Sequence, residues 1–123
     1  MPEFKELSHN TSLAQQMQST GEGPIVLINV FTVDAGEEEA LVEAWKHDAD
    51  FMRKQPGYIS TQMHEGIGGS PTFVNYASWE DVASFRSAFQ NPEFQKRIAQ
   101  YPPSAIASPH LFKKMTVSGH CVG

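Results

Sequence analysis

The sequence predicts an α+β fold whose elements follow the order β-α-β-β-α-β. Runs of β-branched and aromatic residues indicate strands at 25–33, 58–65 and 72–77. Apolar residues at helical spacing follow the first and the third of these strands. Alternating apolar residues indicate a last strand at about 110–117. This order is the split βαβ, or ferredoxin-like, arrangement, in which an antiparallel four-stranded sheet carries two helices on one face.

The first predicted strand, 25–33, is apolar on both of its alternating faces, with one polar exception at Asn29. Asp34-Ala35-Gly36 ends this strand. Three glutamates at 37–39 then stand where the first turn of a helix begins, and the helix dipole favours negative charge at that end. Pro56-Gly57 stops the helix, so the stretch between is predicted to be one amphipathic helix.

Asp48 does not fit the pattern of this helix. It lies on the same stripe as the apolar residues Leu41, Trp45 and Met52. A carboxylate in that place bonds Trp45 or caps a buried donor, and a functional role is the less favoured alternative. The neighbouring His47 points about 100° away from Asp48 around the helix. The two side chains are therefore not expected to form a catalytic pair.

The second and third strands are joined by a glycine-rich turn at 66–71, which predicts a hairpin. Two short helices are expected after the third strand. Ser78, with Asp81 three residues later, is the predicted N-cap of the first helix. Asn91-Pro92 is the predicted start of the second, because asparagine caps helices well and proline suits the first helical position.

Length and charge limit the classes of function. The chain has 123 residues, which is the size of one domain, and 40% of them are hydrophobic, as in a globular protein. Nine lysines and arginines against fourteen aspartates and glutamates give a formal net charge of -5. A nucleic-acid partner is not expected, because no basic surplus is present to neutralise phosphates.

The sequence also argues against a membrane protein and a metal site. The longest apolar stretch, 25–31, is far shorter than the roughly 20 residues of a membrane helix. The start of the chain has no apolar core of the signal-peptide type, so a cytoplasmic location is predicted. The five histidines are scattered, and the single cysteine, Cys121, cannot build a cysteine-based site.

Composition divides the chain into three parts. Residues 1–23 are polar and end in Gly21-Glu22-Gly23, which predicts a flexible N-terminal arm. A lid over a pocket is the less favoured alternative for this arm. Residues 24–117 form the predicted domain, and residues 118–123 form a C-terminal tail.

The first strand also predicts a partner chain. Helices cover only one face of a sheet in this topology, yet Val26, Ile28 and Val30 point to the other face. The N-terminal arm is too polar to cover that face completely. A second copy of the chain, packed sheet against sheet, is the economical solution, so we predict a homodimer.

Three segments of the chain are similar to a known family. They read INVFTVDAGEEEALVEAW, QPGYISTQMH and FVNYASWEDVASFRSAFQNPEFQ. The features that carry the similarity are the strand asparagine before an acidic helix start, the PGY that enters the second strand, and the SWE before a helix with paired phenylalanines. In this order they resemble the antibiotic biosynthesis monooxygenase family, whose members are dimeric α+β barrels. The resemblance covers about residues 24–117.

The resemblance implies oxygen chemistry without a bound metal or flavin, so no cofactor is expected. The implied function is a monooxygenase that uses O2 to oxidise a small electron-rich aromatic, such as a hydroquinone or an anthrone-like polyketide. An electron-rich phenolate or enolate can itself reduce O2. The protein has to ionise the substrate, exclude water and stabilise the developing negative charge. An apolar, aromatic cavity with one or two neutral donors suits this task.

Three residues are the expected catalytic set. Asn29 can donate its side-chain amide to a phenolate or to a reduced oxygen species. His64 is the preferred base, because histidine titrates near neutrality. Trp79 is expected to form a pocket wall, and it matches the tryptophan that closes the third strand in the haem-degrading branch of the family. The expected substrate-binding residues are Phe31, Asn75, Tyr76, Phe85 and Phe89.

Two alternatives remain for the function. The first is a haem-binding or haem-degrading relative, but that branch uses a histidine ligand on the helix that corresponds to Pro92–Ala99, and this stretch has none. The second is a dimeric module that binds a small molecule, or serves in a stress response, without turnover. An oxygenase requires a donor and a base that converge on one cavity, and this convergence separates the alternatives.

Overall fold

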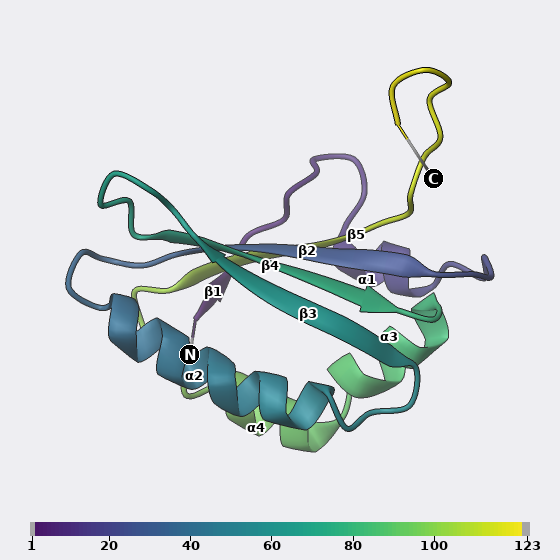
Figure 1. Ribbon diagram of the computed structural model, residues 1–123. Helices are drawn as coiled ribbons and strands as arrows, with labels where there is room; N and C mark the ends of the chain where they lie inside the picture. Colours follow the sequence, from purple (N-terminus) through teal and green to yellow (C-terminus); the bar gives the residue numbers. More distant parts are fainter. Residues whose placement is uncertain (1, 122–123) are drawn as a thin grey trace.

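The computed structural model describes residues 2–121, and a five-stranded sheet with helices packed on one face dominates it (Figure 1). The sheet order is β1-β5-β2-β4-β3, in which β1 and β5 are parallel and the other neighbours are antiparallel. The predicted ferredoxin-like α+β fold is confirmed, and β1 is an additional strand. The strands are β1 (Glu3–Phe4), β2 (Ile25–Thr32), β3 (Tyr58–Glu65), β4 (Thr72–Trp79) and β5 (Ile106–Phe112), and the helices are α1 (Leu13–Met17), α2 (Glu38–Met52), α3 (Val82–Phe89) and α4 (Pro92–Ile98).

Strand β2 lies in the middle of the sheet and fixes which side chains face the helices. Its central residue, Asn29, is paired in register with Asn75 of β4 and with Pro109 of β5. Side chains alternate along a strand, so Leu27 and Phe31 share the helix-facing side with Asn29. Both are buried in the core between the sheet and the helices.

The helix boundaries differ from the prediction at one cap. Ser78 belongs to β4, and the N-cap of α3 is Asp81, whose carboxylate accepts a 2.8 Å hydrogen bond from the Ser84 amide. Strand β4 is longer than predicted because Ser78 and Trp79 still pair with β2. The predicted Asn91 cap of α4 is confirmed, since its side chain accepts a hydrogen bond from the Glu93 amide.

The connection between α2 and β3 depends on Gly57. This residue has a φ of 87°, a region in which side chains are strained, and a side chain there would also collide with Ser84. The glycine therefore lets the chain enter β3 close to the start of α3. This constraint gives a physical reason for the PGY sequence that the resemblance includes.

The last strand was misplaced by the sequence prediction. It spans Ile106–Phe112, not 110–117, and residues 113–121 are exposed and outside the sheet. Proline lacks the amide that a strand normally donates, so Pro109 conceals this strand in the sequence. Its opposite neighbour on β2 is Asn29.

The stretch 2–23, predicted as a flexible arm, contains a strand and a helix. Helix α1 begins at a capping box between Ser12 and Gln15, and it buries Leu13 and Met17 in the common core. The Gln16 side chain accepts from the Leu111 amide and donates to the Leu111 carbonyl, both at 2.9 Å. The Gln16 side chain thus makes the two main-chain hydrogen bonds that a neighbouring strand would make to β5 at Leu111.

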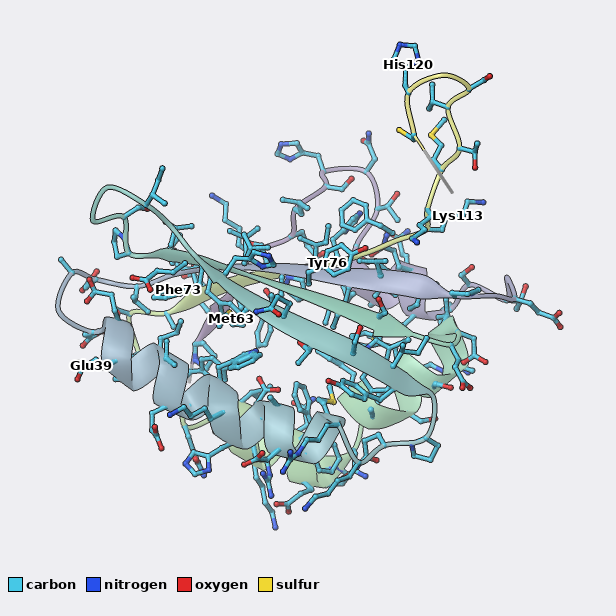
Figure 2. All side chains as sticks on the ribbon, viewed as in Figure 1. Glu39, Met63, Phe73, Tyr76, Lys113 and His120 are labelled. Carbon is cyan, nitrogen blue, oxygen red and sulfur yellow. The ribbon has the colours of Figure 1, made fainter. Side chains whose placement is uncertain are left out.

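Among residues 2–121, no helix lies on the face of the sheet away from α2, α3 and α4. Figure 2 shows Tyr76 on this side of the sheet, and 39% of its surface is exposed. Ile28 and His64 share this face, because β2 and β3 place them beside Tyr76 and Val74 of β4. Among the helices at 2–121, none is both long and apolar enough to span a membrane.

Candidate active site

A cavity of about 40 Å³ lies between the sheet and helices α2, α3 and α4. Four polar side chains line it, namely Asn29, Asp48, Thr61 and Asn75. Seven aromatic side chains complete the lining, namely Phe31, Trp45, Tyr58, Trp79, Phe85, Phe89 and Phe94. The volume holds roughly three water molecules, at about 10–15 Å³ each.

Asn29 supplies an unpaired polar atom to this cavity. Its side-chain oxygen is buried and has no hydrogen-bond partner among residues 2–121. Leaving such a group unpaired costs about 1–3 kcal/mol. A bound molecule with a hydroxyl group would satisfy the oxygen, and the same amide can donate through its nitrogen to an oxyanion.

Asn75 lies beside Asn29 on the neighbouring strand and is held in a fixed orientation. Its side-chain oxygen accepts a 2.5 Å hydrogen bond from the Thr61 hydroxyl of β3. This bond occupies the oxygen of the amide and leaves the nitrogen as its donor. The cavity therefore contains two adjacent carboxamides on the sheet side.

An aromatic chain forms the wall at the other end of the cavity. Trp79 is 1% exposed and packs edge to face against Tyr58 and Phe85, with ring centroids 5.6 and 5.7 Å apart. Phe85 contacts Phe89 at 5.5 Å, and Phe89 contacts Phe94 at 5.3 Å. Such a wall excludes water and offers ring faces to an aromatic ligand.

Asp48 faces the cavity from α2, opposite the two carboxamides. Its Oδ2 atom accepts a 2.5 Å hydrogen bond from the Tyr101 hydroxyl, and the Tyr101 ring stacks on Phe31 at 5.5 Å. The whole residue keeps some exposure, but protein atoms surround the carboxyl group. This burial raises the pKa of Asp48 to about 7, although the Tyr101 hydrogen bond and the Arg97 charge act in the opposite direction.

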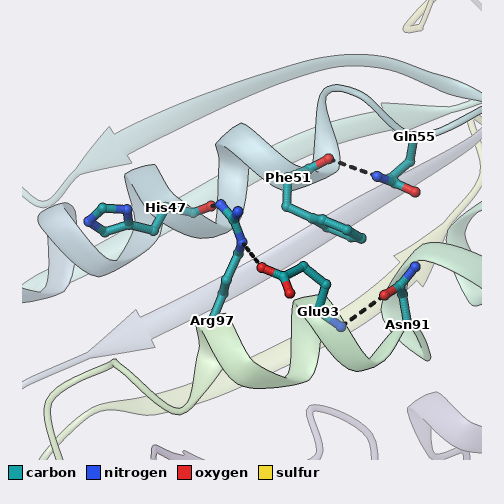
Figure 3. A network of polar contacts seen from close by, with 6 residues as sticks. All are labelled: His47, Phe51, Gln55, Asn91, Glu93 and Arg97. Atoms are coloured by element: carbon teal, nitrogen blue, oxygen red, sulfur yellow. Dashed lines mark hydrogen bonds and ion pairs between the residues drawn. The ribbon is translucent and has the colours of Figure 1, made fainter.

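Arg97 of α4 reaches across to the main chain of α2 at His47, the residue before Asp48 (Figure 3). Its Nη1 donates to the His47 carbonyl oxygen at 2.5 Å, and its Nε donates to Glu93 at 3.2 Å. Its guanidinium also lies 5.8 Å from the centre of the Phe51 ring. The positive charge is thus fixed at the helix interface.

The structure brings together six of the eight site residues that the sequence suggested. They are Asn29, Phe31, Asn75, Trp79, Phe85 and Phe89. His64 and Tyr76 lie on the opposite face of the sheet and do not line the cavity. His64 Nδ1 lies 3.2 Å from the Val74 carbonyl oxygen, and the side chain is exposed. Neither residue can act on a molecule beside Asn29 within one chain.

A β-bulge in β3 puts Tyr58 and His64 on opposite faces of the sheet. Strict alternation along β3 puts Tyr58 on the same face as His64, but the register shifts between Tyr58 and Ser60. Tyr58 therefore lines the cavity while His64 points away from it. Asp48 and Tyr101 were not among the predicted site residues; the sequence signal for Asp48 was a carboxylate on an apolar stripe.

The cavity continues toward the N-terminal segment. A second small cavity shares Asn29, Asp48 and Phe89 with the first and also touches Phe4. A groove of about 360 Å³ lies next to it, against Phe4 and α1, and it again includes Phe89. Phe89 thus lines all three spaces and separates the groove from the carboxamides.

Metal-ligating side chains do not gather in the described part of the chain. Within residues 2–121, no group of three or more His, Cys, Asp or Glu side chains is placed to hold a metal ion. Helix α4, where a haem-binding relative would carry its ligand, presents Glu93, Lys96 and Arg97 as its charged residues.

Comparisons with known proteins identify monooxygenases as the proteins similar to this chain. The sequence model described as "Antibiotic biosynthesis monooxygenase" matches residues 24–100. Deoxynogalonate monooxygenase from Streptomyces nogalater is 30% identical over 70 residues, which are 57% of this chain and 58% of that protein. The match therefore spans less than two thirds of the relative.

Solved structures show the same fold. SnoaB, a cofactor-independent oxygenase from Streptomyces nogalater, superposes with a TM-score of 0.71 at 21% identity, covering 80% of this chain and 99% of SnoaB. A protein from Shewanella loihica PV-4, described provisionally as a monooxygenase, superposes with a TM-score of 0.68 at 32% identity, covering 79% of this chain and 99% of that one.

Proposed function

Because the chain belongs to the antibiotic biosynthesis monooxygenase family, we propose that it is a cofactor-independent monooxygenase of a small electron-rich aromatic, such as a hydroquinone or an anthrone-like polyketide. For an anthrone-like substrate, the CH2 group becomes C=O and the second oxygen atom of O2 leaves as water. Atoms and electrons balance in this reaction without a further reductant, since the substrate supplies the electrons.

The observation that carries this proposal is the unpaired Asn29 oxygen in an aromatic-lined cavity. A hydroxyl group of the substrate satisfies that oxygen on binding. Once the substrate is ionised, the amide nitrogens of Asn29 and Asn75 donate to the negative charge on the substrate or on the reduced oxygen. Two neutral donors stabilise this charge without adding a competing one.

The aromatic wall has a separate role in the proposed reaction. Trp79 and Phe85, 1% and 0% exposed, keep water away from the reacting carbon. A dry cavity strengthens the interactions of the amides with the anion and protects reactive oxygen intermediates from stray protons. Dioxygen, which is small and apolar, enters such a space readily.

A polycyclic substrate needs more room than the 40 Å³ between the carboxamides and the wall. The neighbouring groove of about 360 Å³ provides it. Phe89 lies between the two spaces and keeps some exposure, so a turn of this ring would join them. We therefore place the ring that reacts beside Asn29 and the rest of the substrate in the groove.

Oxygen uptake by metal-chelated, flavin-free protein tests the proposal, with a panel of hydroquinones and anthrones as substrates. Wild-type protein should consume O2 above the spontaneous rate. Asn29→Ala should lower kcat by about 100-fold, the usual cost of removing one donor to a developing oxyanion. Asn10→Ala, an exposed asparagine outside the cavity, is the matched control and should behave as wild type.

Two results would contradict the proposal. A folded wild-type protein that consumes no O2 with any substrate would favour the binding module without turnover. Full activity in Asn29→Ala would show that Asn29 is not the donor to the developing negative charge. A hemin titration separates the haem-degrading alternative, because haem binding shifts the Soret band and this proposal expects no such shift.

The partner in the proposed function is a second copy of the chain. The helix-free face of the sheet exposes Tyr76 and Phe112, each 39% exposed, around the apolar residues Ile28, Val30 and Val74. We propose that two such faces pack together. Light scattering should give the mass of two chains for wild type. Val74→Glu, which places a charge at the centre of the face, should give the mass of one chain with all cavity residues intact.

A further inference from the structure

Asp48 is a buried acid that the roles assigned so far do not use. It lies on the inner side of α2 and lines the same two cavities as Asn29. The carboxyl group and the carboxamide thus face one space from opposite walls, one from a helix and one from the sheet. A molecule that donates a hydrogen bond to the Asn29 side-chain oxygen would also lie against Asp48.

The surroundings of Asp48 fix its position. Tyr101 donates its hydroxyl to Oδ2 at 2.5 Å, which leaves Oδ1 as the second acceptor of the carboxylate. Tyr101 is itself held by stacking on Phe31, with the rings 8° from parallel. The carboxyl group is therefore aimed before any substrate arrives.

The charged groups around Asp48 are few. Tyr101 follows α4 in the chain, and the Arg97 guanidinium belongs to α4. The sheet side presents Asn29 and Phe31, which are neutral. Burial outweighs the Tyr101 and Arg97 contributions and keeps the pKa near 7. At neutral pH about half of the groups are ionised, which is where a general base works best.

We propose, on the basis of the function proposed above, that Asp48 is the residue that removes the substrate proton and that Tyr101 is the residue that positions it. The O–H or C–H bond of the substrate breaks, and an O–H bond forms on the Asp48 carboxylate. The electron pair stays on the substrate, which becomes a phenolate or enolate beside the two amides. This anion reduces O2. Asp48 then gives its proton to the second oxygen atom, which leaves as water.

An anaerobic titration separates proton removal from oxidation. A hydroxyanthracenone whose anion absorbs at longer wavelength than its neutral form is added to the protein at pH 7 without O2. Wild type should show the spectrum of the bound anion. Asp48→Asn, which keeps the size of the side chain, should bind the probe in its neutral form. Asp50→Asn is the matched control, since Asp50 is an exposed acid on the same helix and should behave as wild type.

The pH profile of turnover gives a second measurement. Wild-type kcat/KM should rise with an apparent pKa near 7, whereas Asp48→Asn should be about 100-fold slower at pH 7 and recover only where the substrate ionises by itself. Tyr101→Phe removes a hydrogen bond to the ionised carboxylate, so its profile should shift to higher pH. A purely structural role for Tyr101 would lower the rate without moving the profile.

The outcomes distinguish this inference from the proposed function. Anion formation by wild type without O2 consumption would support Asp48 as the proton acceptor and overturn the monooxygenase. O2 consumption with the same pH profile in wild type and Asp48→Asn would overturn the inference alone. A probe that wild type binds only in its neutral form, or does not bind, would also overturn it. Thermal unfolding of each variant confirms that the compared proteins are folded.

Discussion

On the face of the sheet toward α2, α3 and α4, strands β2 and β4 present Asn29 and Asn75 inside an aromatic shell. On the opposite face, the next residues along the same strands are Ile28 and Tyr76, which have no helix over them. Residues with such different surroundings are direct neighbours in the sequence, Ile28 beside Asn29 and Asn75 beside Tyr76. In the functions proposed above, one strand would serve chemistry with one set of side chains and assembly with the other.

The face on which a residue lies therefore decides its role more than its chemical type does. His64 is a reasonable base by its chemistry, but it lies on the helix-free face of the sheet. Asp48 is an unusual base by its chemistry, but it faces the two amides. Four experiments test how strictly the two faces are separated, beginning with the largest expected effect.

Replacing Trp79 with alanine should be the most damaging change on the covered face. The ring is 1% exposed and contacts Tyr58 and Phe85 edge to face. Large-to-small changes of this kind cost about 3–5 kcal/mol of unfolding free energy. Urea denaturation measures the loss. Ile67→Ala, at a turn residue that is 93% exposed, is the control, and an equal loss in both variants would contradict the assignment.

The pH dependence of stability tests the buried state of Asp48. Its folded pKa of about 7 lies above the ordinary value of 3.8, so the unfolded chain loses this proton first. The contribution of Asp48 to the free energy of unfolding should therefore be largest at low pH. It should fall by a few kcal/mol as pH rises from about 4 to 7. Asp48→Asn should lack this fall in a series of urea denaturations. Matching pH curves for the two proteins would show that the carboxyl group is solvated.

Replacing Phe89 with alanine should join the cavity to the groove. The ring lines both spaces, and removing it opens a continuous site. The rate with three-ring substrates should rise about tenfold relative to the rate with one-ring substrates. Competition kinetics with one substrate of each size measures this ratio. An unchanged ratio would mean that large substrates do not pass this ring.

The smallest effect is expected for His64→Ala. The side chain is exposed on the face away from Asn29, and its ring contacts a backbone carbonyl. Stability should change by less than about 0.5 kcal/mol, and oxygen uptake should match wild type. A strong loss of turnover with normal folding would mean that a catalytic base lies on the helix-free face, and the two faces would then not be separate in function.

Much of the fold could be predicted from periodicity alone. The runs at 25–33 and 58–65 gave strands close to the observed ones, because β-branched and aromatic residues were bounded by clear breakers. The last strand was misplaced because Pro109 interrupts its pattern. Strand β1 was missed because two residues carry no periodicity, and it forms only by pairing with Ile106 and Ala107.

The candidate site was predictable where a residue broke its local pattern. Asn29 stood out as an amide within an apolar strand, and Asp48 stood out on an apolar helix stripe. What the pattern could not supply was the partner of each residue. Tyr101 is 53 positions from Asp48, and only the packing of α2 against the segment after α4 brings them together. The bulge in β3 likewise exists only in the paired sheet.

The hydrogen bonds of Gln16 have a consequence for any shortened form of the protein. Strand β1 and the Gln16 amide occupy the outer edge of β5, so they keep its main-chain groups from pairing with another molecule. Both precede residue 24, where the family match begins. A chain that begins at residue 24 would keep every carboxamide and aromatic ring of the 40 Å³ cavity, yet β5 would carry an open edge. Such a protein is expected to aggregate before it loses its chemistry.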